Sequence, residues 1–470
     1  MKKIIFTIVM LMFALMAFPQ DSIPNIISSY TSVTNTFTYD VIVNSSSQVN
    51  NPRDLDFHPN GDLWIINTGY EFYPNNPNPY VIITSANSGP NPGGSTVKVT
   101  NPGMIGQSDL WQQDGNAWHF MSLPSGIAFS DNGNFATSTS VLDANHWLNQ
   151  PYGIDGKFTG PALWSSDPLI YAQDAGPGTN GSHLDMLHAS PYSMGIASEK
   201  DNVFWVYDDY SNDIVRYDFA EDHGPGNDDH ADGVVLRYQD MGLNAINHDI
   251  VNHLVLDSEK KWLYFVDGGN KRILRLDITS GDTAANYSAG NMNQDLLALD
   301  QYQKKTGFIW EEVVITGLDQ PAGIDIIDDR LVVTDHSNGD IIFYDVSNVP
   351  ATEIGRVQTN EPGIMGVVVG PNGRIWYANA ALNKVVKIEP SSIIADVEED
   401  QLVLIGNRIY PNPVFNTLHF NSTANFVSIS DLNGKLILAN NNINTIDVSM
   451  FNKGVYFIDV DGVKSKFIKY

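Results

Sequence analysis

The sequence predicts an all-β protein, a six-bladed β-propeller followed by a small β-sandwich. An apolar strand pattern recurs about every 45 to 70 residues, a spacing typical of stacked supersecondary units. The composition agrees, because 38 glycines suit many turns and 20 tyrosines and 21 phenylalanines suit strands. After Pro390 the repeats stop and a shorter run of alternating strands begins.

Six copies of the pattern align on one position in the first strand, and four of them have glycine there. The second strand of each copy usually ends in Asp or Asn, and an apolar third strand follows in most copies. We expect four short strands per copy, and six such copies give a six-bladed propeller. The residues at the glycine position, in chain order, are Asp54, Gly126, Gly195, His253, Gly323 and Gly366.

A propeller ring closes when a strand from one terminus completes the blade at the other. Residues 37–43 form the one good strand before the first copy, so we expect them to pair with the sixth copy as its outer strand. The expected divisions are a signal peptide at 1–20, a lead-in at 21–36, the propeller at 37–390, a linker at 391–406 and the sandwich at 407–470.

The N-terminus is typical of a secretory signal peptide. Lys2 and Lys3 precede an apolar run from Ile4 to Phe18, which is too short for a membrane-spanning helix. The chain has no cysteine, so disulfides and thiolate chemistry are excluded. A formal charge of −28 argues against binding to nucleic acid or anionic membranes, since both require basic surfaces.

Residues 262–273 carry the clearest copy of the repeat. There Leu263-Tyr264-Phe265-Val266-Asp267 is followed by Asn270-Lys271-Arg272-Ile273. This pattern resembles the NHL-repeat family, and the resemblance covers about residues 50–390. It implies the propeller fold but no particular activity, because the family includes scaffolds, receptors and enzymes.

The C-terminal region holds a second set of motifs. In order they are Tyr410-Pro411-Asn412-Pro413, the turn Asn433-Gly434-Lys435, the strand Gly454-Val455-Tyr456-Phe457 and a basic end. Together they resemble the type A C-terminal sorting domain of the Bacteroidetes type IX secretion system. The resemblance implies export to the periplasm, recognition by the secretion machinery, and then attachment to the cell surface or release. The alternative is an ordinary adhesive sandwich domain.

One rim of the propeller is expected to collect the polar residues that a plain repeat lacks. Segments before each first strand and turns after each second strand share this rim, here called the top rim. Both long insertions, about 69–79 and 139–160, also emerge there. We expect ligand binding at this rim by residues from three copies and one insertion, namely Arg53, Asp54, His119, His146, Trp147 and His336.

Three further histidines are candidate metal ligands. His188 and His248 precede first strands, and His253 occupies a glycine position, from which its side chain should point into the central channel. Neutral imidazoles beside carboxylates can hold a divalent ion, so Zn²⁺ or Ca²⁺ at the propeller axis is one expectation. The alternative is structural, because Asp residues at second-strand ends commonly accept hydrogen bonds from the following turn.

An acidic segment at 221–233 contains Asp228, His230, Asp232 and Gly233 in a spacing similar to that of a calcium loop. The twelfth position, however, is Gln239 instead of Glu, and the segment falls on the rim opposite the top. We therefore expect a solvated acidic loop there, with a cation site as the alternative.

Two functions remain open from the sequence. The first is an exported propeller that binds an extracellular glycan, peptide or protein at its top rim. The second is a metal-assisted lyase or hydrolase that uses His188, His248 and His253. These motifs do not decide whether the protein is an enzyme.

Overall fold

A computed structural model describes residues 25–68, 93–141, 159–173, 180–227, 229–286, 299–394, 409–410, 414–432, 434–461 and 463–470. The chain divides into two compact units, Met1–Asp396 and Val397–Tyr470. The expected signal peptide, most of the two insertions and most of the linker lie outside the described residues.

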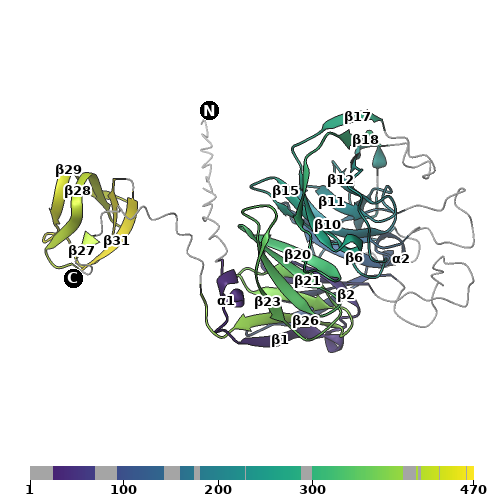
Figure 1. Cartoon of the computed structure of the whole chain (residues 1–470), viewed down its shortest axis with the longest axis horizontal. Helices are drawn as coiled ribbons and strands as arrows, with labels where there is room; N and C mark the ends of the chain where they lie inside the picture. The colour runs from purple at the N-terminus through teal and green to yellow at the C-terminus, as the bar shows by residue number, and fades with distance from the viewer. Residues whose placement is uncertain are drawn as a thin grey trace, which may run out of the picture. The chain divides into compact units, whose positions relative to one another are not determined.

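The first unit consists of six sheets, and the four core strands of each sheet pair antiparallel and mostly follow one another in the chain (Figure 1). The first sheet comprises β2 (Pro52–Phe57), β3 (Leu63–Asn67), β4 (Ser95–Thr100) and β5 (Ser108–Gln112). The second comprises β6 (Pro124–Phe129), β7 (Asn134–Thr139), β8 (Ala162–Ser165) and β9 (His183–Met186). The third begins with β10 (Ser193–Lys200), β11 (Val203–Asp208), β12 (Asp213–Asp218) and β13 (Val234–Tyr238).

The next three sheets repeat the arrangement. The fourth comprises β14 (Leu254–Asp257), β15 (Trp262–Asp267), β16 (Arg272–Asp277) and β19 (Trp310–Val314). The fifth comprises β20 (Pro321–Ile327), β21 (Arg330–Asp335), β22 (Asp340–Asp345) and β23 (Thr352–Gln358). The sixth comprises β24 (Ile364–Val369), β25 (Ile375–Asn379), β26 (Lys384–Pro390) and β1 (Phe37–Asn44).

The six first strands form a closed ring. Strand β2 contacts β6, and the contacts continue through β10, β14, β20 and β24 back to β2. Six four-stranded units around one axis make a six-bladed propeller, so the predicted fold class is confirmed. Strand β1 pairs antiparallel with β26, with Tyr39 opposite Ile388, and gives the sixth sheet its outer strand.

The third sheet is larger than the repeat pattern predicts. Strands β17 (Asp282–Asn286) and β18 (Gln301–Thr306) lie in the chain between β16 and β19 of the fourth sheet. In space, β18 pairs parallel with β13, which extends the third sheet to six strands. The two strands inserted into the fourth repeat therefore extend the neighbouring third sheet.

The lead-in to the propeller is part of its core. Helix α1 (Ile27–Thr31) buries Ile27 and Tyr30 against the fifth and sixth sheets. The Tyr30 hydroxyl accepts a hydrogen bond from the Ile375 N–H at 3.0 Å and donates one to the Ile388 carbonyl at 2.8 Å. A second short helix, α2 (Ala117–Phe120), precedes β6.

The second unit is a small antiparallel domain with its own core. Its strands are β27 (Ile409–Tyr410), β28 (Thr417–Ser430), β29 (Leu436–Asp447), β30 (Gly454–Val460) and β31 (Val463–Lys469). The long strand β28 pairs with β29 along most of its length, with β27 near one end and with β30 near the other. Gly434, at a φ of 75°, forms the predicted turn before β29.

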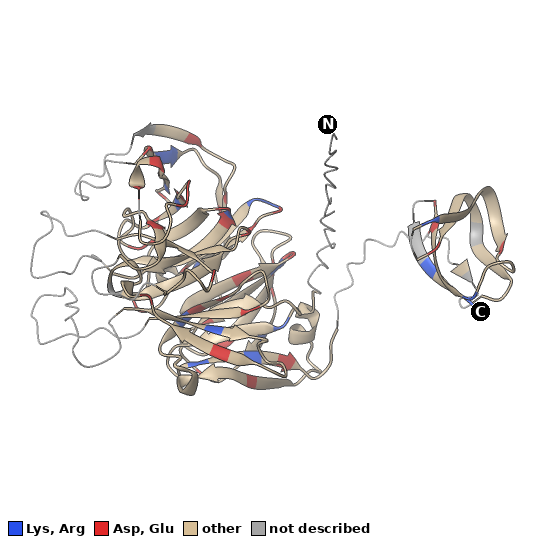
Figure 2. Ribbon diagram, turned by 180° about the vertical axis from the view of Figure 1, so that it is seen from behind, with Lys and Arg blue, Asp and Glu red and all other residues tan. Residues whose placement is uncertain are grey.

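No helix among the described residues is both long and apolar enough to cross a membrane. Figure 2 shows Asp and Glu residues, in red, spread over many strands and turns of the propeller, in keeping with the acidic composition.

Candidate functional site

The propeller axis encloses a cavity of about 160 Å³ lined by the first strands of all six sheets. Four of those strands carry glycine at the aligned position because neighbouring strands approach closely there. A Cβ on Gly366 would lie 2.7 Å from Cα of Asp54, and one on Gly195 would lie 2.8 Å from Cα of His253. Asp54 and His253, the two residues that replace glycine in the pattern, thus lie directly against glycines of neighbouring strands.

Three carboxyl groups of the cavity lining accept hydrogen bonds from the backbone of the next sheet. Asp54 accepts from the Ile127 N–H at 2.9 Å, and Asp56 accepts from the Phe129 N–H at 2.8 Å. Asp325 accepts from the Val369 N–H at 2.6 Å. The carboxyl groups therefore fasten neighbouring sheets together around the axis.

Burial changes the charge of these groups. It raises the pKa of Asp54 and of Asp56 to about 8 and that of Asp325 to about 7. Desolvation is the main cause, because it penalises the charged carboxylate, and the neighbouring carboxyl groups add repulsion for Asp56 and Asp325. At neutral pH the cavity is consequently far less negative than its composition suggests.

His253 lines the same cavity and is buried. Its Nε2 donates to the Arg53 carbonyl at 3.1 Å, and its Nδ1 lies 3.5 Å from Oδ2 of Asp54. Burial lowers the pKa of His253 to about 4, so the imidazole is neutral at pH 7. The ring is thereby fixed between the first and fourth sheets.

Arg53 connects the cavity lining to the top rim. Its guanidinium donates to the His248 carbonyl at 3.2 Å and to the Asp249 carboxylate at 3.4 Å. The Arg53 side chain is buried, whereas Asp249 is 88% exposed, so the pair reaches from the interior to the surface.

Above Arg53 three residues form what we call the His248 cluster, namely Tyr192, Asp209 and His248. The His248 ring stacks on Tyr192 with 3.6 Å between ring centres and an interplanar angle of 3°. Its Nδ1 lies 2.7 Å from Oδ2 of Asp209, while 49% of the side chain is exposed. The carboxylate fixes the orientation of the ring.

Local sequence explains how the cluster forms. Tyr192 precedes β10, Asp209 follows β11 and His248 precedes β14, so all three belong to the top rim. The Asp209 N–H donates to the Tyr192 carbonyl, which holds the two segments together. The sequence analysis placed His248 on this rim but missed Tyr192, whose position directly before β10 was the available signal.

The predicted metal ligands are not brought together. His188 is buried with its ring 4.7 Å from that of His230, and burial together with neighbouring histidines holds its pKa well below the usual value. His248 faces Asp209, and His253 faces Asp54 and a backbone carbonyl. Each of the three rings thus lies against a different group. Among the described residues these three do not form a group at ligand distance.

The other predicted binding residues are also dispersed. His119 packs against Phe120, with 4.3 Å between ring centres, beside the second sheet. His336 is half-buried in the fifth sheet, where its Nδ1 lies 3.4 Å from Oε1 of Gln320 and burial lowers its pKa. His146 and Trp147 lie outside the described residues.

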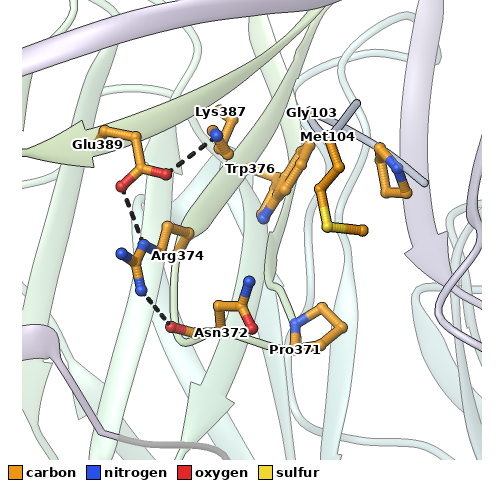
Figure 3. Close-up of a pocket in the computed structure, with 9 residues that line it drawn as sticks. Gly103, Met104, Pro371, Asn372, Arg374, Trp376, Lys387 and Glu389 are labelled. Atoms are coloured by element: carbon orange, nitrogen blue, oxygen red, sulfur yellow. Dashed lines mark hydrogen bonds and ion pairs between the residues drawn. The ribbon is translucent and has the colours of Figure 1, made fainter. Parts of the chain in front are cut away.

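A second, smaller pocket of about 50 Å³ lies where the loop after β4 meets the sixth sheet (Figure 3). Glu389 pairs with Arg374 and Lys387, both at 3.0 Å, and Trp376 forms part of the lining. Pockets for small-molecule ligands commonly enclose roughly 300–1,000 Å³. This one is too small to hold more than a fragment of a ligand.

Comparison with known proteins decides the nature of the second unit. Residues 408–470 match the family described as "Secretion system C-terminal sorting domain". The C-terminal unit is a type IX sorting domain. The resemblance predicted from its motifs is confirmed, and the sorting domain identifies the protein as one exported to the outer membrane, the cell surface or the medium. No curated protein sequence matches the chain.

Solved structures similar to this chain include propeller proteins of several kinds. An auxiliary nutrient binding protein from Bacteroides ovatus is 10% identical, with 76% of this chain and 78% of that chain covered and a TM-score of 0.43. A streptogramin B lyase is 16% identical, with 76% and 98% covered and a TM-score of 0.38. A luciferin-regenerating enzyme is 11% identical, with 77% and 97% covered and a TM-score of 0.43. These values carry no argument about activity.

Proposed function

We propose that the protein is an exported binding protein whose propeller holds an extracellular glycan, peptide or protein at the His248 cluster. The observation that carries the proposal is the half-exposed His248 ring, fixed from one side by Asp209 and supported over its face by Tyr192. A preorganised polar side chain on an aromatic support loses little conformational entropy on binding.

The charges around the cluster favour one class of ligand. The Asp209 carboxylate touches His248, and Asp249 next to it is almost fully exposed. Carboxylates accept hydrogen bonds from hydroxyl, amide and ammonium groups and repel anions. A neutral glycan or a peptide with exposed amide or amino groups therefore fits better than a uronic-acid polymer.

Affinity electrophoresis of the full chain through gels containing neutral or acidic polysaccharides tests the proposal. We expect retardation by a neutral polysaccharide, and loss of that retardation in His248→Ala. His336→Ala is the matched control, because it removes a half-buried histidine from another sheet. Equal binding by the wild type and His248→Ala would exclude the cluster as the site. A soluble peptide panel on the same variants extends the test to the other ligand class.

A lyase or hydrolase is the second candidate, and the Asp209–His248 pair favours it. A carboxylate on Nδ1 leaves Nε2 of a half-exposed imidazole available for proton transfer. The metal-assisted form of this activity has less support, since the three predicted histidine ligands lie apart. Product formation from a bound polysaccharide, abolished in both His248→Ala and Asp209→Asn, would distinguish an enzyme from a binding protein.

A further inference from the structure

A cluster of three metal-ligating side chains lies between the second and third sheets, away from the His248 cluster. Asp185 belongs to β9 and is fully buried. His223 and Asp232 belong to the acidic loop that joins β12 to β13. Each of the three residues offers one ligand atom, and these atoms all lie within 4.8 Å of one another. The segment predicted to be a solvated acidic loop is thus folded against the neighbouring sheet.

The loop reaches β9 through two glycines in the left-handed region. Gly224 has a φ of 81° and Gly226 a φ of 74°. The Gly226 N–H donates to the His183 carbonyl at 2.8 Å, which ties the loop to the first residue of β9. A Cβ on Gly226 would lie 2.9 Å from the Gly181 carbonyl oxygen, so glycine is required for this approach.

Backbone groups orient both carboxylates. Oδ1 of Asp185 accepts from the Met186 N–H at 2.7 Å, and Oδ2 of Asp232 accepts from the Glu221 N–H at 3.2 Å. Oδ1 of Asp232 then faces Nε2 of His223 at 3.3 Å. Carboxylates that bind metals are commonly held by such hydrogen bonds on their other oxygen.

We propose that Asp185, His223 and Asp232 bind a divalent transition metal ion, with Zn²⁺ as the best match. Two ligand atoms about 2.0–2.1 Å from a tetrahedral Zn²⁺ stand roughly 3.3 Å apart. The separation between Nε2 of His223 and Oδ1 of Asp232 has this value. One imidazole with two carboxylates suits Zn²⁺ better than Ca²⁺, which takes six or more oxygen ligands.

The geometry differs from the linear calcium loop that the sequence suggested. Gln239, at the twelfth position, donates to Asp213 at 3.0 Å inside the third sheet. His230 faces His188, and Asp229 accepts from the Ala231 N–H to begin a 3₁₀ turn. The third ligand comes instead from β9 of another sheet, so a bound ion would fasten the loop to that sheet.

Calorimetric titration of the metal-free full chain with ZnCl₂ at physiological salt tests the proposal. We expect one Zn²⁺ per chain, an increase in Tm on binding, and affinity reduced roughly tenfold or more in His223→Ala and in Asp232→Asn. Asp222→Asn is the matched control, because this exposed carboxylate lies in the same loop and carries the same charge. It should bind as the wild type does.

Three outcomes would overturn the proposal. One is the absence of stoichiometric Zn²⁺ binding, which would leave His223 and Asp232 as a simple ion pair. Another is an equal loss of affinity in Asp222→Asn, which would mean diffuse attraction of cations to an acidic surface. The third is preferential Ca²⁺ binding that His223→Ala leaves intact. Circular dichroism of Asp232→Asn separates a lost ligand from a misfolded loop.

Discussion

Buried carboxyl groups near the axis give the propeller a stability that depends on pH. In the unfolded chain Asp titrates near its ordinary pKa, whereas burial raises the pKa of Asp54 and Asp56 to about 8 in the folded state. The folded state therefore binds more protons between these values. The resulting stabilisation is complete below the unfolded pKa and is lost as pH rises through the folded pKa.

We predict that the free energy of unfolding falls between pH 5 and pH 9, and that Asp56→Asn reduces this fall. Asparagine has no proton to lose, so one of the titrating groups disappears. Urea unfolding across the pH range measures the slope, and Asp109→Asn, an exposed carboxylate on β5, is the control. His253 acts in the opposite direction below its unfolded pKa, since its lowered pKa removes stability as the solution becomes acidic. A slope unchanged in Asp56→Asn would contradict the assignment.

A second buried group holds the third sheet together. Arg237 is fully buried and donates to Asp208 at 2.9 Å and to Asp213 at 2.8 and 2.9 Å. Its Nε donates to the Tyr302 hydroxyl on β18 at 2.7 Å. One guanidinium thus joins β11, β12, β13 and the inserted strand.

We predict that Arg237→Met destabilises the propeller by about 3–5 kcal/mol, because two carboxylates are left buried without their cation. Lys260→Met is the control, since Lys260 pairs with Asp329 at the surface and such pairs contribute less than about 1 kcal/mol. Denaturant unfolding compares the two. Similar losses for both variants would show that burial of the Arg237 network is unimportant.

At the scale of single residues, the sequence predicted some roles and not others. Asp208 ends a second strand, where an Asp was expected to accept a hydrogen bond from the following turn. It does so, because its carboxylate accepts from the Ser211 N–H. His253 was expected in the channel from its glycine position, and the structure places it there. His188 and His248 were expected to bind one metal ion but face different groups. Repeat spacing indicates the rim on which a residue lies, but it does not indicate the direction of the side chain.

Among the secondary-structure elements, helix α1 secures the closing sheet. The Tyr30 hydroxyl forms hydrogen bonds with backbone groups of both β25 and β26, and the Tyr30 ring stacks on Phe37 and Phe343. A residue of the lead-in therefore acts as part of the last blade.

We predict that Tyr30→Phe costs about 1–3 kcal/mol, because the buried Ile375 N–H loses its acceptor while the ring remains. Tyr39→Phe is the matched control. Its hydroxyl donates to the Gln358 carbonyl at 3.3 Å from a 40% exposed residue, so its removal should change stability by roughly 0.5 kcal/mol or less. Thermal unfolding of both variants checks the difference, and equal Tm values would disprove a role for the Tyr30 hydroxyl.

Strand periodicity predicted most blade strands but not where the inserted ones would pair. Residues 310–315 and 353–358 were expected as fourth strands, and β19 and β23 form at these places with bounds that differ by one residue. Strands β17 and β18 were not expected, because their polar sequences carry little apolar alternation. Their pairing depends on the free edge of β13, which no local pattern reveals.

At the scale of the whole molecule, the propeller and the sorting domain are separate compact units with separate cores. The sequence predicted two such units, since the repeats stop near residue 390 and the sorting motifs begin near residue 410. The proposed binding residues were less predictable, because the His248 cluster combines side chains that flank strands of two different sheets.

We predict that deletion of residues 408–470 abolishes delivery to the cell surface and leaves propeller stability unchanged. The sorting domain carries the export information, and the propeller core contains none of its residues. Cell fractionation with surface protease treatment follows delivery, while the Tm of the purified truncated chain follows folding. Surface exposure of the truncated chain would show that another segment directs export.

Strand β1 also determines when the propeller can finish folding. Its register places Phe37 opposite Pro390, so one ladder joins the two ends of the repeat array. Pairings between distant segments form late, because the intervening chain must be ordered before the ends meet. A chain cut short before β26 would leave β1 without its partner and expose strand edges that promote aggregation. The propeller can therefore close only after the strands of the last blade have been synthesised.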